Sequence, residues 1–279
     1  MKKLDALKTE MHTMHDLEDL TNMLEQTAAR TIAQMRTNIM NSRPFFRETW
    51  RVYGILKQLT PPSPEVVHKH LIVIIAIDWG MPGNLLTKVT AEASRLQKSH
   101  GADMLVAGKM AHPQFRSDDG HTVHFFSAPK DVSLSDIQPI YKVVAGYAKV
   151  TIVYPRFESL SVQTVQTTSF SATQNEQSLV TQDAASKTID PARFVVDPSP
   201  QYIANYLNEA VVGLTVHHYF AEAILAYSAA QMVAMRNGHD NAKQEGKKIQ
   251  TRYHRARREL IDSKLRELYG SRAAHKGGK

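Results

Sequence analysis

Apolar and small residues near the start of the chain recur at steps of three and four positions. This spacing predicts that residues 1 to about 58 form a helix with one buried stripe. The stripe is narrow, like the seam of a coiled coil. Pro44, in Ser42-Arg43-Pro44, predicts a kink or a division of this helix. The stripe consists of Leu4, Leu7, Met11, Met14, Leu17, Thr21, Leu24, Ala28, Ile32, Met35 and Ile39.

A second stripe with an average step close to 3.5 residues lies toward the other end of the chain. Ser199 is the expected N-cap, and Pro200 suits the first helical turn. If unbroken to Tyr269, this helix has about 70 residues and is roughly 100 Å long. Toward its end, Ala, Gly and Ser replace Leu. The stripe consists of Ile203, Leu207, Val211, Leu214, His218, Ala221, Leu225, Ser228, Met232, Met235, His239, Ala242, Gly246, Ile249, Tyr253, Ala256 and Leu260.

The segment between these helices has short apolar runs separated by turn residues. Residues 71–77 form a continuous β-branched run, which predicts a strand buried on both faces. We expect a turn at Asp78–Gly83 and a helix capped by Asn84 that ends near Ser99. Further predicted elements are strands at 104–107, 122–126 and 149–154, a helix from Ser133 or Ser135 to about Tyr147, and a hairpin partner within 157–170.

Together these elements predict an α/β fold joined to a long antiparallel coiled coil. The helices at the two ends pair and flank a small, Rossmann-like domain with a mostly parallel sheet. Residues 171–191 read as a loop because they are polar and contain few apolar side chains. The expected domains are residues 1–58 (first helix), 66–192 (α/β domain), 197–270 (second helix) and 271–279 (basic tail).

Composition narrows the chemistry that the chain can perform. The sequence has no cysteine, which excludes disulfides, thiolate zinc sites and a cysteine nucleophile and fits a reducing compartment. No long apolar stretch resembles a signal peptide or a membrane span. Of a formal net charge of +7, residues 241–279 hold 12 Lys and Arg against 4 Asp and Glu. This basic end predicts an acidic partner.

Five segments in order along the chain resemble the ATP synthase gamma subunit family, and the resemblance covers essentially the whole chain. Its patterns are I-T-x-A-M-x-M-V-A-A, S-R-P, D-R-G-L-C-G-x-L-N, M-V-A-M-K-x-A-T-D-N-A and Y-N-K-A-R-Q. Trp79, Pro82 and Gln231 depart from these patterns, and the family's last signature is eroded. The matching segments are Leu20-Thr21 with Glu25 and Ala28-Ala29, Ser42–Pro44, Ile77–Asn84, Met232–Arg236 with Asp240–Ala242, and Tyr253–Arg258.

The resemblance implies a mechanical rather than a catalytic role. The paired helices would form a rotor shaft inside a ring of alpha and beta subunits, at the cytoplasmic face of the cell membrane. The α/β domain would be a foot bound to the epsilon subunit and the c-ring, with Phe194 and Asp197 as contacts. Acidic loops of the beta subunits would meet Arg255, Arg257, Arg258 and Lys264. The shaft seam would include Leu20, Leu24, Ala28, Met232, Met235, Ile249, Tyr253 and Leu260.

This role implies no cofactor, no metal, no small-molecule substrate and no nucleic acid, but other functions remain open from the residues alone. A phosphate- or nucleotide-binding α/β enzyme with a coiled-coil oligomerisation stalk could use the turn Asp78–Gly83, although that turn lacks the G-x-G-x-x-G and G-K-[ST] patterns. His121 with His124, or His217 with His218, could bind a metal but lack further ligands. The basic end could bind nucleic acid or anionic lipid instead of protein.

Overall fold

The computed structural model describes residues 2–59, 67–115, 121–129, 132–171 and 199–276. The chain divides into two compact units. The first contains Met1–Thr27 and Met232–Lys279, and the second contains Ala28–Gln231. Each terminal helix therefore contributes one half to each unit.

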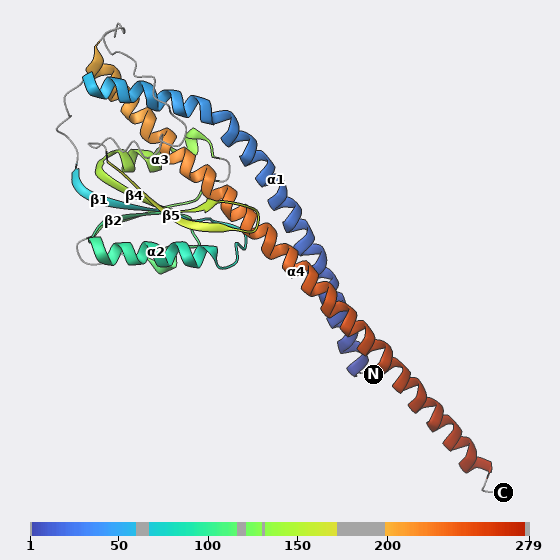
Figure 1. Cartoon of the computed structure of the whole chain (residues 1–279). Helices are drawn as coiled ribbons and strands as arrows, with labels where there is room; N and C mark the ends of the chain where they lie inside the picture. Colours follow the sequence, from blue (N-terminus) through green and yellow to red (C-terminus); the bar gives the residue numbers. More distant parts are fainter. Residues whose placement is uncertain (1, 60–66, 116–120, 130–131, 172–198, 277–279) are drawn as a thin grey trace. The chain divides into compact units, whose positions relative to one another are not determined.

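The second unit is built on a five-stranded sheet with strand order β3-β2-β1-β4-β5 (Figure 1). Neighbouring strands are parallel except β4 and β5, which form an antiparallel hairpin. This order is that of a doubly wound, Rossmann-like sheet, as the sequence predicts. The elements are β1 (Val67–Ile75), α2 (Leu85–His100), β2 (Asp103–Ala107), η1 (His112–Gln114), β3 (Val123–Phe126), α3 (Leu134–Ala145), β4 (Tyr147–Phe157) and β5 (Gln163–Ser171).

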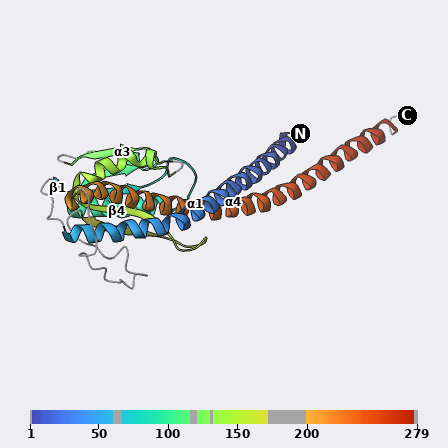
Figure 2. The same cartoon turned by 90° about the horizontal axis from the view of Figure 1, so that it is seen from above.

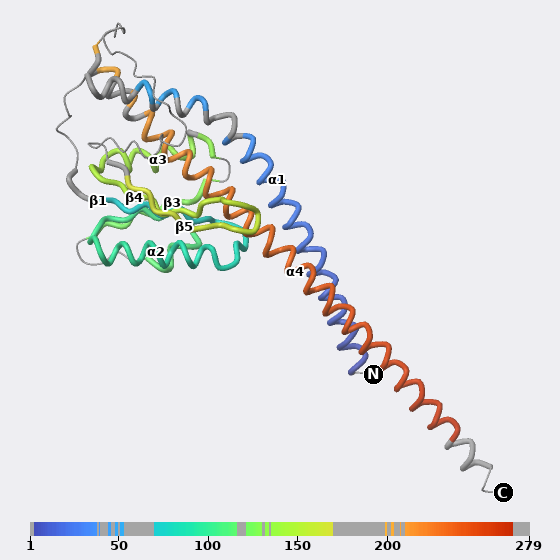
Figure 3. The backbone as a smooth tube through the Cα atoms, in the orientation of Figure 1, coloured from blue at the N-terminus to red at the C-terminus, as the bar shows by residue number. Residues whose placement is uncertain are grey.

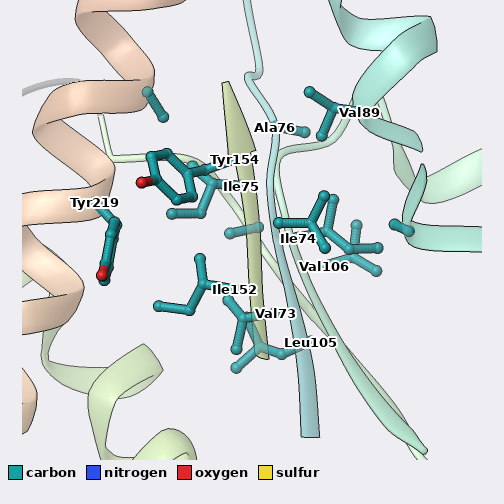
Figure 4. Close-up of a cluster of buried hydrophobic side chains, with 14 of the residues drawn as sticks. Val73, Ile74, Ile75, Ala76, Val89, Leu105, Val106, Ile152, Tyr154 and Tyr219 are labelled. Atoms are coloured by element: carbon teal, nitrogen blue, oxygen red, sulfur yellow. The ribbon is translucent and has the colours of Figure 1, made fainter. Parts of the chain in front are cut away.

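Both faces of the sheet are covered, which explains why residues 71–75 of β1 are apolar without alternation. Val73 and Ile75 of β1 point toward α4 (Pro200–Lys276), whereas Ile74 and Ala76 point toward Val89 of α2 (Figure 4). All of these side chains are buried. Helix α3 lies on the same face as α4 (Figure 1). The continuous hydrophobic run thus fills two cores at once.

Part of α1 (Lys2–Leu59) packs beside α4 within the second unit (Figure 2). Met35 and Ile39 of α1 form a buried cluster with Ala221, Ile224 and Leu225 of α4. In the same part of α4, the opposite face enters the core above the sheet through Val216, Tyr219, Phe220, Ala223 and Tyr227. This double contact explains why the helix halves next to the sheet belong to its unit.

In the first unit, α1 and α4 run side by side in opposite directions (Figure 3). Successive positions along α4 contact positions of decreasing residue number on α1, so the two helices are antiparallel. The contacts that define this order are Glu25 with Arg236, Glu18 with His239, Thr21 with Gly238, and Met14 with Gly246.

Several elements differ from the sequence predictions, among them β1, which spans Val67–Ile75 instead of 71–77, and β4, which spans Tyr147–Phe157 instead of 149–154. Helix α1 is not divided at Pro44, which is exposed on one continuous helix. Helix α3 ends at Ala145, so Tyr147 begins β4 instead of ending the helix. Helix α4 continues to Lys276, so most of the expected tail is helical.

Two of the predicted N-caps are confirmed, and a third lacks the expected side-chain hydrogen bond. Ser199 and Ser133 act as caps, because their hydroxyls accept hydrogen bonds from the backbone N–H of Tyr202 and Asp136. Asn84 occupies the cap position of α2 without a side-chain capping bond. The loop predicted at 171–191 lies almost wholly outside the described residues, as do Phe194 and Asp197.

Candidate partner-binding surface of the terminal helices

The end of α4 emerges from its contact with α1 within the first unit. Ile249 is buried, and Tyr253, Ala256 and Leu260 are half-buried at regular heptad spacing. From residue 261 to 269 every side chain is exposed. This change marks the end of the stripe that α1 covers and the start of a bare helical segment.

The four basic residues predicted to contact a partner lie on or beside this segment. Arg255, Arg257, Arg258 and Lys264 are all exposed. Arg255 is bonded to Glu259 one turn later, with Nε 3.2 Å from Oε1. Within the described part of the chain, no ion pair is formed by Arg257, Arg258 or Lys264. Three cations are therefore available to acidic groups from outside the chain.

The bare segment also has an apolar face, which our reading of the sequence missed. Its apolar side chains have exposed fractions between 45% and 69%. Their spacing of four, three and one residues places them on one side of the helix. An exposed apolar face beside unpaired cations is typical of a protein-binding surface, rather than of a solvated helix. These residues are Ile261, Leu265, Leu268 and Tyr269.

Most of the predicted seam residues are covered in the structure. Ala28, Met235 and Ile249 are buried, whereas Leu24, Met232, Tyr253 and Leu260 are half-buried. Leu20 departs from the prediction, because 45% of its side chain is exposed. Leu17 of the wider stripe is exposed as well.

The stripe on α1 instead passes through two glutamates, Glu18 and Glu25. Oε1 of Glu18 lies 3.7 Å from Nε2 of His239, and Oε1 of Glu25 lies 3.5 Å from Nε of Arg236. Between them, the hydroxyl of Thr21 bonds back to the carbonyl of Leu17, so its methyl can pack on α4. A strict seven-residue repeat that starts at Leu4 and Met11 leads to Glu18 and Glu25, so this spacing is the sequence signal that identifies the two glutamates.

The turn after β1 is closed by its own carboxylate. Oδ1 of Asp78 accepts hydrogen bonds from the backbone N–H groups of Lys109, at 2.6 Å, and Ala128, at 3.1 Å. A phosphate at the carboxyl edge of a doubly wound sheet needs free backbone N–H groups. Here a negative charge already occupies that position, which argues against the phosphate-binding reading of Asp78–Gly83.

Tyrosines fill the space above β1 and β4, where doubly wound folds usually bind ligands. The rings of Tyr154 and Tyr219 lie 4.7 Å apart (Figure 4). The hydroxyl of Tyr227 donates to the carbonyl of Ile75 at 3.0 Å. Burial raises the pKa of Tyr227, and burial together with the carboxylate of Glu222 raises the pKa of Tyr154. Both phenols therefore remain neutral structural groups.

The paired histidines serve structural contacts. Nε2 of His217 lies 2.9 Å from the carbonyl of Val132, and burial lowers its pKa. His218 faces Glu222 one turn later on α4. His121 packs near Gly101, while His124 lies on β3. Across the described residues, no group of three or more His, Asp or Glu side chains is arranged to hold a metal ion.

In the portion of the chain covered by the structure, no helix combines the length and the apolar content needed to cross a membrane.

The fold and this surface define a class: a protein whose two terminal helices flank a doubly wound α/β domain and present an exposed partner-binding surface. A family model described as ATP synthase matches residues 3–274. The chain belongs to this ATP synthase family. It is 23% identical to the ATP synthase gamma chain of Bdellovibrio bacteriovorus over 99% of this chain and 100% of the relative. It is 24% identical to the ATP synthase gamma chain of Stenotrophomonas maltophilia, over 96% of this chain and 98% of the relative.

Solved structures show the same fold. A chain of the Euglena gracilis mitochondrial ATP synthase, from a structure of OSCP, F1 and c-ring, aligns with a TM-score of 0.63 at 16% identity. That alignment covers 98% of this chain and 96% of the other. A chain from a structure of the central stalk and c-ring of the Tetrahymena thermophila mitochondrial ATP synthase aligns with a TM-score of 0.57 at 19% identity. That alignment covers 78% of this chain and 98% of the other.

Proposed function

We propose that this chain is the central rotor stalk of an ATP synthase and is not itself catalytic. It would transmit the rotation of an ion-driven c-ring to a ring of alpha and beta subunits. The observation that carries this proposal is the end of α4, where the covered seam is followed by an exposed apolar face and where Arg257, Arg258 and Lys264 form no ion pair with another described residue. Membership of the ATP synthase family supports the same reading.

The terminal helices are proposed to pair as one antiparallel coiled coil. The heptad spacing of buried and half-buried residues on α4, from Met232 to Leu260, supports this pairing. The two helices present different side chains around their circumference. As they turn, each beta subunit would meet a different surface and favour a different conformation, which is differential binding to alternative states.

Arg255, Arg257, Arg258 and Lys264 are proposed to face acidic loops of the beta subunits. Their exposure and the lack of a described partner for three of them support this role. Exposed ion pairs contribute only about 0–1 kcal/mol each. Such weak contacts suit a surface whose partner must change at every step of rotation.

The remaining assignments concern the foot and the place of the complex. Residues 66–192, together with Phe194 and Asp197 just after them, would bind the epsilon subunit and the c-ring, and the complex would lie on the cytoplasmic face of the cell membrane. The central-stalk and c-ring assembly named for the Tetrahymena neighbour supports this arrangement. A proton or a sodium ion would drive it.

The test is co-purification with alpha and beta subunits expressed together with this chain. Replacing the four basic residues by glutamine should weaken association with the alpha–beta ring about tenfold, with the loss growing at low salt, where such pairs are strongest. The matched control replaces four exposed lysines of the other unit, Lys88, Lys98, Lys109 and Lys142. Failure of the unaltered chain to form any complex with alpha and beta would contradict the proposal.

A further inference from the structure

We propose that a short layer of small and charged residues sets the register in which α1 and α4 pair. This register layer specifies which turn of one helix faces which turn of the other. It rests on the proposed function only for its consequence in the motor, because the contacts themselves belong to the isolated chain. The layer consists of Thr21, Glu18 and Glu25 on α1, and Arg236, Gly238, His239 and Gly246 on α4.

Size is the first element of the register layer. A Cβ added at Gly238 would lie 3.3 Å from Cγ2 of Thr21, and one added at Gly246 would lie 3.7 Å from Cβ of Met14. Glycine inside a helix costs about 1 kcal/mol relative to alanine. Glycine at 238 is therefore explained by the space that Thr21 needs, whereas a Cβ at 246 would make only ordinary van der Waals contact with Met14.

Charge is the second element. Glu25 and Arg236 approach to 3.5 Å, and Glu18 and His239 to 3.7 Å. Three of these side chains are more than two-thirds covered, with exposed fractions of 23% for Glu25, 24% for His239 and 29% for Glu18. Nδ1 of His239 also lies 3.3 Å from the backbone oxygen of Glu18. Partly covered charged and polar groups need their own partners, so a mismatch is disfavoured.

A purely apolar heptad stripe permits slips of seven residues, because each slip restores the same pattern. In this chain both slips are unfavourable. A slip in one direction moves Met14 from Gly246 to Tyr253, which sets two large side chains against each other. A slip in the other direction moves Glu18 from His239 to the turn of Met232, where a carboxylate would face a thioether.

The register decides how much of α4 extends past α1. Extending the observed register toward the start of the chain brings Leu4 opposite the turn of Ala256, and both are half-buried. Every side chain from residue 261 to residue 269 is exposed. A slip of one heptad would cover or uncover about 10 Å of helix. The register layer thus sets the length of the partner-binding surface.

Two members of the layer depart from the family pattern M-V-A-M-K-x-A-T-D-N-A. Gly238 stands in place of its alanine, and His239 in place of its threonine. The covered Glu18 lies opposite His239. In this chain, a residue on one helix is thus matched to a residue on the other.

Disulfide trapping reads the register directly, because the parent chain has no cysteine. In the Met14→Cys/Gly246→Cys variant, the Cβ–Cβ separation of 3.7 Å lies within the range of native disulfides. Two further variants report slips of one heptad: Met14→Cys/Tyr253→Cys and Leu7→Cys/Gly246→Cys. We expect the first pair to oxidise at least about tenfold faster than either slip pair in dilute full-length protein.

The four acidic and basic members of the layer are then removed by combining Glu18→Leu, Glu25→Leu, Arg236→Leu and His239→Leu with each thiol pair. Leucines should strengthen the apolar stripe, so circular dichroism should show undiminished helix content. Selectivity for the 14–246 pair should fall below about threefold. Retention of full selectivity in this background would overturn the proposal.

A charge exchange provides the second variant. Glu25→Arg places two arginines together and should reduce 14–246 trapping, whereas Glu25→Arg/Arg236→Glu should restore it. Equal trapping in the parent and in Glu25→Arg would contradict a role for charge. These experiments need no other subunit. Normal register selectivity without assembly on alpha and beta would refute the proposed function alone, and assembly without selectivity would refute the register layer alone.

Discussion

At the scale of single residues, Gly108 shows how closely the loops at the carboxyl edge of the sheet approach one another. It has a φ of +120°, which side chains rarely adopt. A Cβ at this position would lie 2.6 Å from the backbone carbon of Ala76 and the nitrogen of Ile77. The glycine is needed for conformation and for space, whereas Gly83, with φ of +61°, has open space around it.

We therefore predict that Gly108→Ala lowers the free energy of unfolding by about 3 kcal/mol or more, since strain and overlap both act. Gly83→Ala is the matched control, with an expected loss of about 1 kcal/mol from conformation alone. Urea unfolding followed by tryptophan fluorescence measures both. Equal losses for the two variants would contradict the packing argument.

A second residue-scale prediction concerns His70 and His217. Burial lowers the pKa of both, with help from Lys149 and His100 at His70. Below the ordinary histidine pKa, near 6.5, the unfolded chain then binds more protons than the folded one. Their contribution to stability is complete above that pH and is lost as pH falls toward the lowered values.

Unfolding by urea at several pH values between about 7.5 and 5 tests this. In His217→Gln, stability should decline less steeply with falling pH than in the parent. His12→Gln removes an exposed histidine from α1 and serves as the control. An unchanged pH dependence in His217→Gln would show that this histidine does not contribute.

At the scale of elements, the helix starts follow from local chemistry. A serine hydroxyl that accepts a backbone N–H satisfies one of the unpaired donors of the first turn. Ser133 does so for α3, bonding the N–H of Asp136 at 3.3 Å. Ser135, the other serine considered from sequence, bonds only to the hydroxyl of Ser133 in the described structure.

We predict that Ser133→Ala destabilises the protein by about 1 kcal/mol, whereas Ser135→Ala has a smaller effect. Thermal unfolding by circular dichroism compares the two variants. The reverse order would assign the cap to Ser135.

At the scale of the whole molecule, stability and partner binding are assigned to different residues. The cores consist of the sheet with its covering helices and of the helix contacts within each unit. Residues 261–269 contribute to none of them, because every one is exposed. They carry the apolar face and Lys264, which we assign to partner binding.

A chain ending at Leu260 should therefore unfold within about 0.5 kcal/mol of the full chain, because residues 261–269 are all exposed and loss of exposed residues has little effect on stability. Its coupling in an assembled ATP synthase should fall, measured as ATP-driven ion pumping in vesicles. A matched variant keeps the full length and replaces Ile261, Leu265 and Leu268 by serine. Full pumping by both would contradict the assignment of this surface.

The sequence by itself determined the elements and their order. Heptad spacing, β-branched runs and capping serines act over a few residues, so they identify helices and strands without knowledge of the fold. The covered stripe of α4 was predictable for the same reason, from Met232 through His239 to Leu260. Apolar residues alone were a poorer guide on α1, where Leu17 and Leu20 are exposed.

Only the tertiary structure decided the phase of α1, because the choice between Leu17 and Glu18 depends on what α4 presents opposite. There, His239 and Arg236 provide partners for two glutamates, and a carboxylate with a partner can occupy a covered position. The same holds for Asp78, whose Oδ1 accepts hydrogen bonds from the backbone N–H groups of Lys109 and Ala128, 31 and 50 residues further along the chain. Local residue spacing predicts neither the contacts between α1 and α4 nor the hydrogen bonds of Asp78, because both depend on how the chain folds back on itself.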